Sequence, residues 1–517
     1  MDYRNFVGGA YASRSVAVAA ETCENLFVER VRADGSGGRA ELVLHQSPGY
    51  RLFAMSDDGS DPRYIFLEPA TNRVFVIFGR KFCELLIQGG SYLGTVANVK
   101  VWGAIGDETP SNTVLGRVSM ATNGRQILIV SEAMAFVFDV RLNTLAPVLE
   151  APFSRVNGVG GAGSCTYMDG YFIVTAFGTR QFFYSSILDG TTGNWSSLDV
   201  ASKEGAMDGV IVAVADHREL LLFGAQTTEP FYDSGGATNP FAPIPGTFIE
   251  QGLVGLNAIV KADNALFFLG MDKLGAGIIY RLQGYKAQRV STHAIEWIIQ
   301  QYPRLDDVVL WAYQEAGHTV VVCCFPSGGE VINEPGGRVR VLPGGATWAY
   351  DCATQVWHRL THLVNGIREQ YAGRVHGFAF NKHLIGGGDG TGKLYWQHRQ
   401  FMSHDGDLIR RERAAPVVGT GGKFATLGTL QLDLQVGVLD DTGCGECKDI
   451  DNPFTITMVD ANGISTQFDT NLRTVCTTSE CVDKDYTFTV RVTDSHGQTA
   501  TGNGDILASC TDPNIVG

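Results

Sequence analysis

A polar turn recurs seven times along this chain, and each time a short apolar run and then an aromatic-rich run follow it. The turns lie at Asn72, Asn123, Asp169, His217, Asp263, Ala316 and Asn381. Successive turns are about 46 to 53 residues apart, and the last step is about 65 residues. Self-similarity at this period, with several short strands in each unit, is typical of a β-propeller.

The apolar runs are four to six residues long, which suits strands that are buried on both faces, as in a blade between two neighbouring blades. We therefore predict that each apolar run is an inner strand and that the aromatic run is the next strand outward. An ordinary β-sandwich is the alternative, but sandwiches rarely repeat at this period. The sequence thus predicts an all-β fold, with a propeller of about seven blade-like repeats and a smaller β-sandwich-like platform domain.

Composition supports this fold class and limits the partners. Charged residues are only 18% of the 517 residues and Gly is abundant at 63, as in proteins rich in tight turns. The formal charge of −14 disfavours gripping of DNA, although DNA can slide past an acidic wall that repels its phosphates. No apolar stretch reaches the roughly 18 residues of a membrane span, and no secretory signal is visible, so we expect synthesis in a cytoplasm.

The repeat divides the chain into three parts. Residues 1–55 do not fit the repeat and form an N-terminal segment, residues 56–405 form the propeller, and residues 406–517 form a second, smaller β domain with alternating strands. We predict that residues 1–55 join residues 406–517 in one platform, because neither segment belongs to the repeat.

Two insertions interrupt the repeat. Ser291-Thr292 can cap a helix over residues 293–299, which Pro303 would end, and its apolar face should pack on a blade. Residues 327–345 are rich in Gly and Pro and predict a surface loop.

Two cysteine pairs in the C-terminal domain could carry metal or redox chemistry. Four thiolates at Cys444, Cys447, Cys476 and Cys481 could hold a structural zinc, although the wider gap of the second pair weakens this interpretation. Disulfides are favoured over zinc, and unpaired thiols stay open. The first six cysteines, from Cys23 to Cys352, have no regular spacing and are predicted to be buried thiols.

The sequence predicts no enzyme, no catalytic residues and no cofactor. It contains no nucleophile elbow, no P-loop and no zinc-protease helix. The histidines are expected to be structural or solvent-facing. A glycosidase built on a propeller remains open, because the separation of two carboxylates cannot be read from sequence.

Short motifs occur in an order that is more specific than any one of them. They include Gly178-Thr179-Arg180-Gln181-Phe182, Asp189-Gly190-Thr191-Thr192-Gly193-Asn194-Trp195, Glu229-Pro230-Phe231, Ile249-Glu250-Gln251-Gly252, Thr347-Trp348-Ala349-Tyr350-Asp351, Gly388-Asp389-Gly390 and, near the N-terminus, Cys23-Glu24-Asn25-Leu26-Phe27. In this order, residues 6 to 415 resemble the packaged-DNA stabilisation proteins of short-tailed bacteriophages, also called tail hub or nozzle proteins.

The resemblance implies a structural role in the virion. Such proteins assemble in the host cytoplasm as a homo-oligomeric ring, typically a hexamer, under the portal and its adaptor, the head-to-tail connector. They extend the DNA channel, retain packaged DNA that passes without specific binding, and support a tail needle, fibre or tailspike, with no membrane insertion. The cysteine pairs are not part of the family pattern.

We predict that the platform of residues 1–55 and 406–517 lines the ring and that the propeller sits outboard, because neither platform segment belongs to the repeat. The alternative function belongs to a different class, a carbohydrate-binding or carbohydrate-cleaving propeller used in host recognition.

Overall fold

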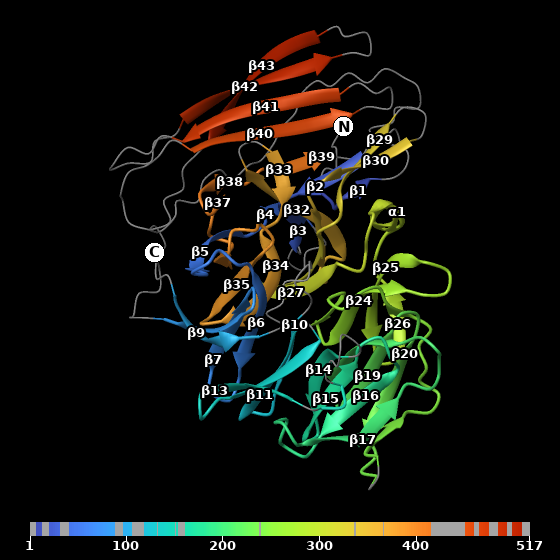
Figure 1. Cartoon of the computed structure of the whole chain (residues 1–517). Coiled ribbons are helices and arrows are strands. Elements are labelled where there is room, and N and C mark those ends of the chain that lie inside the picture. Colours follow the sequence, from blue (N-terminus) through green and yellow to red (C-terminus); the bar gives the residue numbers. More distant parts are fainter. Residues whose placement is uncertain are drawn as a thin grey trace.

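The computed structural model of the chain describes residues 7–12, 20–31, 41–87, 97–105, 118–131, 133–149, 151–153, 161–236, 239–334, 338–364 and 367–414. It also describes the backbone of four strands between residues 450 and 508. Within these residues the chain is almost entirely β-strand, with one helix (Figure 1). The prediction of an all-β propeller is confirmed.

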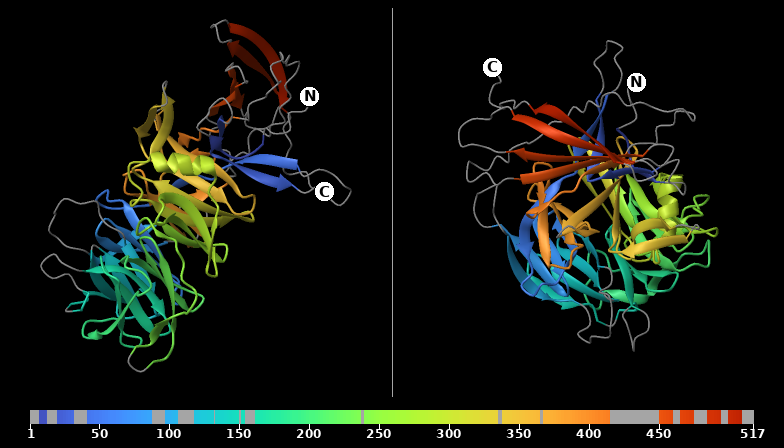
Figure 2. Two further views of the ribbon diagram at one scale, coloured as in Figure 1. Left: turned by 90° about the vertical axis from the view of Figure 1, so that its right-hand side faces the viewer. Right: turned by 90° about the horizontal axis from the view of Figure 1, so that it is seen from above.

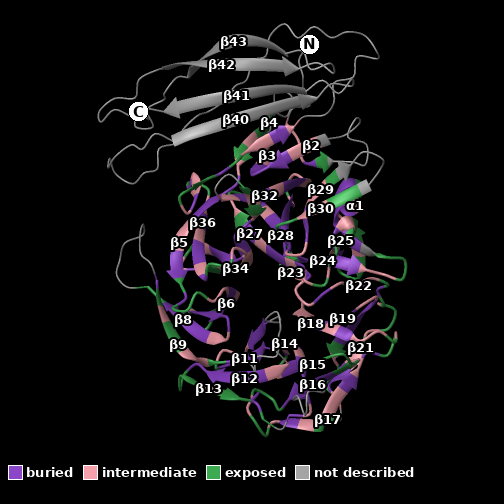
Figure 3. Ribbon diagram, turned by 45° about the horizontal axis from the view of Figure 1, so that its top comes forward, coloured by how far each residue is buried: buried purple, intermediate pink, exposed green. Residues whose placement is uncertain are grey.

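Seven antiparallel sheets, here numbered as blades in chain order, surround a common axis (Figures 1 and 3). Blade one is β6 (Pro62–Glu68), β7 (Arg73–Phe78), β8 (Lys81–Leu86) and β9 (Asn98–Ala104). Blade two is β10 (Val118–Thr122), β11 (Gln126–Ser131), β12 (Met134–Asp139) and β13 (Thr144–Pro147). Blade three is β14 (Ala162–Met168), β15 (Tyr171–Ala176), β16 (Gln181–Ser185) and β17 (Trp195–Ser202). Blade four is β18 (Val210–Asp216), β19 (Glu219–Gly224), β20 (Thr228–Asp233) and β21 (Phe241–Pro243).

The last three blades complete the ring. Blade five is β23 (Ile259–Ala262), β24 (Ala265–Met271), β25 (Ala276–Gln283) and β26 (Lys286–Arg289), and β22 (Gly252–Leu253) also pairs with β24. Blade six is β27 (Val309–Glu315), β28 (His318–Phe325), β31 (Ala346–Asp351) and β32 (Val356–Val364), and β33 (Ile367–Gln370) pairs with β32. Blade seven is β34 (Gly373–Ala379), β35 (Lys382–Gly387), β36 (Lys393–His398) and β5 (Gly49–Met55). The innermost strand β34 lies against β6 of blade one, which closes the ring.

The recurring polar turn is the hairpin between the first and second strands of each blade. In five blades the hairpin loop has two residues, and both have positive φ, as in a type I′ turn. These loops are Asp169-Gly170, His217-Arg218, Asp263-Asn264, Ala316-Gly317 and Phe380-Asn381. The apolar run is the second strand and the aromatic run the third, so the repeat marks the interior of every blade.

Adjacent blades are held together by aromatic side chains and by hydrogen bonds between their innermost strands. Phe138 of blade two meets Phe75 and Phe82 of blade one, with ring centroids 5.3 and 5.1 Å apart. The Ser119 hydroxyl accepts a hydrogen bond from the backbone N–H of Cys165 (3.0 Å) in the next blade. Such side-chain partners cover strand edges that would otherwise be open to pairing with another chain.

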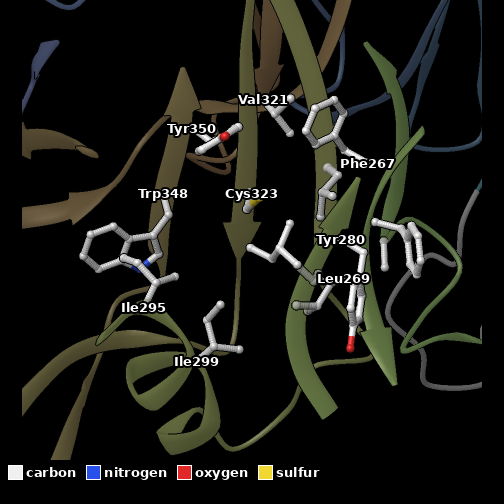
Figure 4. Packing of buried hydrophobic residues seen from close by; sticks show 14 of the residues in the cluster. Phe267, Leu269, Tyr280, Ile295, Ile299, Val321, Cys323, Trp348 and Tyr350 are labelled. Carbon is white, nitrogen blue, oxygen red and sulfur yellow. The ribbon is translucent and has the colours of Figure 1, made fainter. Parts of the chain in front are cut away.

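The predicted helix exists as α1 (His293–Gln301), and it packs on the propeller as expected. The Thr292 hydroxyl accepts from the N–H of Ile295 and caps it. Ile295 and Ile299 belong to a buried cluster with Trp348, and Figure 4 shows Ile295 beside that ring. Among the described residues, no helix has the length and hydropathy that a membrane span needs.

The prediction of a surface loop at 327–345 is corrected. Residues in this insertion form a hairpin of β29 (Gly329–Glu334) and β30 (Arg338–Pro343), paired antiparallel. Val331 and Val341 pack against the buried cluster of blades five and six, which gives this Gly-rich segment an apolar face to fold on.

Strands from both ends of the chain cover the outer edges of blades six and seven. β5 pairs with β36 and completes blade seven, so the predicted boundary at residue 55 is corrected: Gly49–Met55 belongs to the propeller. Next to β5 lie β37 (Ser403–His404) and β38 (Asp407–Leu408). The N-terminal segment also contains β1 (Tyr11–Ala12), β2 (Ala20–Glu24) and the hairpin of β3 (Leu26–Val31) and β4 (Glu41–Gln46).

The C-terminal strands continue the sheet of blade six. Its outer strand β32 pairs with β2, which pairs with β39 (Glu412–Ala414). β39 pairs with β40 (Ile450–Val459), followed by β41 (Ser465–Thr474), β42 (Lys484–Thr493) and β43 (Thr499–Ala508). Figure 2 shows these strands at one end of an elongated molecule, with blades two and three at the other end.

Replacing Ile299 should weaken the contact between α1 and the propeller. We expect Ile299→Ala to lower the free energy of unfolding by about 2–5 kcal/mol, because this fully buried side chain leaves a cavity. The matched control Gln300→Ala, at an exposed position of the same helix, should change it by less than about 0.5 kcal/mol. Urea denaturation followed by tryptophan fluorescence measures both, and equal midpoints would contradict the packing described here.

Candidate functional site

The junction between the propeller and the C-terminal sheet contains a buried network of polar side chains that joins distant parts of the chain. We define the junction as β2, β32, β33 and β39. β2 runs parallel to β32, with Glu24 opposite Arg359, and antiparallel to β39, with Glu24 opposite Glu412. One short strand therefore connects the propeller to the strand that leads into the C-terminal sheet.

Asn25 connects three segments of the junction. Its backbone has a φ of 51°, a left-handed conformation that Asn tolerates better than most residues. Its side-chain amide donates to the Thr361 hydroxyl (3.0 Å) and to the carbonyl of Arg410 (2.7 Å), and its side-chain oxygen accepts from the N–H of Thr361 (3.0 Å). The amide is thus satisfied by the propeller on one side and by the C-terminal segment on the other.

Arg368 gathers carboxylates from three other elements. Its guanidinium lies 3.1 Å from Glu24 on β2, 3.0 Å from Glu330 on the inserted hairpin and 3.4 Å from Glu412 on β39. Burial alone would lower the pKa of Arg368, but the three carboxylates raise it overall. The Thr361 hydroxyl also donates to Glu24 (2.8 Å), so this buried carboxylate has two partners.

Arg413 fixes the start of the chain to the same place. Its buried guanidinium donates to the backbone carbonyls of Gly9 (2.7 Å) and Thr22 (3.0 Å). Backbone carbonyls are acceptors that any residue supplies, so this contact depends on position rather than on side-chain identity. The junction therefore holds residues 7–12, blade six and β39 as one unit.

A buried aromatic and histidine cluster lies where β5 and β37 close blade seven. The ring of His404 stacks on Tyr50, with centroids 4.4 Å apart and planes 8° apart. Tyr371 contacts both rings, and His362 binds Asp407 through Nε2 (3.0 Å). Burial, His362 and Arg411 hold the pKa of His404 well below its usual range, so this closing cluster is built around a neutral imidazole.

His358 on β32 is a second buried imidazole close to the junction. Burial lowers its pKa to about 4; the Asp351 carboxylate opposes this shift, and His318 adds to it. The Nδ1–H of His318 donates to the Asp351 carboxylate (2.8 Å). The interior of blade six therefore favours an uncharged His358.

The predicted cysteine roles have different outcomes. Cys444, Cys447, Cys476 and Cys481 lie outside the described residues, so the preference for disulfides over zinc stays a prediction. Of the first six cysteines, five are buried free thiols as predicted, and Cys352 is half-buried. Burial raises the pKa of Cys23 to about 12, which leaves it protonated and unreactive. In the part of the chain that the structure describes, no group of His, Cys, Asp or Glu could hold a metal ion.

No residue of the junction was predicted from sequence to have a functional role. Asn25 lies in one of the motifs that carried the family resemblance, and Arg413 lies in a short charged run, residues 410–413. Arg368 and Thr361 stand in no motif, and only the packing of blade six against β2 gives them a role. No sequence signal available from one chain would have found them.

The fold and the junction define a class of protein: a β-propeller whose outer sheet continues into a second β region. The family model described as "Bacteriophage P22 Gp10, beta-propeller" matches residues 87–395, which is more than half of the chain. The chain belongs to that family and is a structural protein of a bacteriophage.

Similarity to solved structures is weaker. The N-terminal domain of Nup159 shares 8% identity at a TM-score of 0.36, covering 76% of this chain and 99% of that one. The β-propeller domain of Myceliophteria_thermophila Cps50 (Swd1) shares 8% identity at a TM-score of 0.38, covering 67% and 99%. Likeness at these scores carries no functional information. No curated protein matches the chain.

Removing the Arg368 guanidinium should destabilise the junction. We expect Arg368→Met to lower the free energy of unfolding by about 3 kcal/mol, because Glu24 stays buried without its cation. Arg304→Met is the matched control: its pair with Asp306 is more than half exposed on both sides, so its removal should leave the stability almost unchanged. Chemical denaturation measures both variants. Equal decreases in the free energy of unfolding for the two variants would contradict a buried, stabilising role of Arg368.

The buried imidazole of His358 should make the protein less stable in acid. The unfolded chain takes up a proton below pH 6.5, whereas the folded chain does so only near pH 4, so stability falls as the pH drops through this window. Between pH 7 and 5 the wild type should lose about 2 kcal/mol more than His358→Gln, which has no proton to gain. Denaturation at pH 7 and pH 5 gives the difference. Parallel losses in the two proteins would contradict a neutral His358.

Proposed function

We propose that the chain is a subunit of a tail nozzle or hub, a homo-oligomeric ring that extends the DNA channel below the portal and its adaptor. The observation that carries this proposal is the family match over the propeller together with the junction that binds a second β region to it. In this role the protein retains packaged DNA and supports a tail needle, fibre or tailspike. It acts by position and has no catalytic step.

The layout of the chain supports an assembly role. A component that bears load needs its parts held in one orientation, and the junction joins β2, blade six and β39 through buried ion pairs and hydrogen bonds. Blade seven is joined to the same segment through β5 and β37. The platform of the ring would consist of the N-terminal strands and the C-terminal sheet, with the propeller outboard. Heterologous contacts between copies would close the ring.

The charge of the chain supports passive passage of DNA. The chain has a formal charge of −14, so its overall electrostatic field repels the phosphates of DNA. DNA would therefore be retained by a narrow channel that is closed below, and not by specific binding. Such a wall lets the genome leave without first breaking many ion pairs.

A surface hollow gives one reason to keep the carbohydrate-binding alternative. The hollow has a volume of about 400 Å³ and is lined mainly by polar residues, including Thr179, Arg180, Gln181 and Ser202. Hydroxyl, amide and guanidinium groups suit sugar hydroxyls and a sugar carboxylate. Binding of an acidic glycan that Arg180→Ala abolishes would favour this function over the nozzle.

Particles made without the chain test the nozzle proposal. We expect heads that fill with DNA and then lose it, because nothing closes the channel below the adaptor. Adding the purified protein should restore retention of nuclease-resistant DNA, and images of complete particles should show a ring of this chain at the tail vertex. Particles that keep their DNA without the chain, or a chain located elsewhere, would overturn the proposal. Arg304→Met protein, altered only at an exposed ion pair, should restore retention as well as the wild type.

A further inference from the structure

Blades two and three lie at the end of the molecule opposite the C-terminal sheet (Figures 1 and 2). At this end, residues 186–194 connect β16 to β17. Two large apolar side chains of this loop point to solvent, Ile187 with 64% and Leu188 with 57% of its surface exposed. Single exposed apolar residues are common, but neighbouring ones in a structured loop often mark an interaction site.

The backbone holds Leu188 in an unfavourable conformation. Its φ of 61° lies in the left-handed region, where the Cβ of a leucine is strained. Two contacts from neighbouring hairpins compensate: its N–H donates to the carbonyl of Gly170 (2.8 Å), and its carbonyl accepts from the Asn123 side chain (3.0 Å). The structure therefore fixes Leu188 in place although its side chain touches little of the protein.

The rest of the loop is equally ordered. The buried side chain of Gln126 donates to Asp189 (3.1 Å) and accepts from the N–H of Gly190 (2.9 Å). The indole of Trp195 donates to the carbonyl of Gly190 (3.0 Å). A preformed loop loses little conformational entropy when a partner binds, which favours affinity.

Two further leucines are exposed on blade two, each bonded to a residue that neighbours the loop or its charged partners. Leu149 is exposed, and its N–H donates to the Thr192 hydroxyl of the loop (3.0 Å). Leu142 is exposed at the β12–β13 turn, where Asp139 caps its N–H (2.8 Å). We call Leu142, Leu149, Ile187 and Leu188 the distal apolar surface.

Two arginines beside this surface are more exposed than the carboxylates they pair with, and Arg125 also lies near Asp189 of the loop. Arg125 and Arg218 have 59% and 83% of their side chains exposed, whereas their partners Asp139 and Asp169 have 12% and 23% exposed. The carboxylates are turned into the protein, so the cations face outward in a chain whose overall charge is −14. A partner with carboxylates beside its apolar side chains would complement this surface.

We propose that the distal apolar surface docks a segment of a different polypeptide that carries aliphatic or aromatic side chains flanked by Asp or Glu. The choice of a different polypeptide rests on the proposed function, because copies in the ring would meet through the platform at the other end. The apolar and cationic character of the surface does not depend on that role. Ile187 and Leu188 enter the partner, and Arg125 and Arg218 pair with its carboxylates.

Photo-crosslinking in assembled particles tests this docking. Leu188 is replaced by p-benzoylphenylalanine, particles are irradiated, and the crosslinked peptides are identified by mass spectrometry. We expect a peptide of another virion polypeptide with apolar residues beside Asp or Glu. Adding Arg218→Gln should lower the yield about two- to fivefold, the effect of one exposed ion pair. Leu274 in the β24–β25 hairpin, 97% exposed, is the matched control and should give no such product.

Three outcomes would overturn the inference. Crosslinks to other copies of this chain would make the surface a contact within the ring, and yields no higher than at Leu274 would show an unoccupied surface. A crosslinked partner segment without carboxylates would remove the electrostatic argument. The same crosslinking residue placed at Ile187 is a second test, in case the substitution at Leu188 disturbs the loop. If the ring forms but position 188 gives no crosslink, the docking proposal fails and the proposed nozzle function stands. If the chain is absent from particles, both proposals fail.

Discussion

Backbone pairing between β5 and β36 is the contact on which the rest of the structure depends. It joins residues about 340 positions apart and completes blade seven, the blade whose inner strand β34 lies against blade one. The stacked rings of Tyr50 and His404 fill the space behind this pairing. The N-terminal segment supplies both β5, which completes blade seven, and β2, which joins blade six to β39. The propeller and the second β region are therefore structurally coupled.

The junction combines buried charge with a connecting role. A buried ion pair is weak evidence for stability, because desolvation offsets much of the attraction. Its value lies in specificity: Arg368 reaches carboxylates on β2, β39 and the inserted hairpin, and only one arrangement of these elements satisfies it. The three hydrogen bonds of Asn25 to Thr361 and Arg410 further restrict how these elements can be arranged.

The sequence predicted the elements whose pattern is local. The polar turns are the inner hairpins, the helix begins at its Thr292 cap, and the aromatic runs are third strands. The innermost strands were not predicted from sequence. On β34, for example, Gly377 faces Ile65 so closely that a Cβ would lie 2.4 Å from it, so packing between blades fixes this position. The hairpin at 329–343 was wrongly predicted as a loop, because its Gly and Pro content hid two short strands.

The sequence by itself determined the class of fold. Each blade needs a polar hairpin turn and then buried strands, and this local requirement repeats along the sequence at a regular period. Tertiary structure alone decided where the chain closes, which strand carries blade six into the C-terminal sheet, and which side chains meet at the junction. Those contacts pair residues hundreds of positions apart, such as Asn25 with Thr361, and no periodic pattern records them. The exposure of Ile187 and Leu188 belongs to the same group, since only packing shows which apolar residues stay outside.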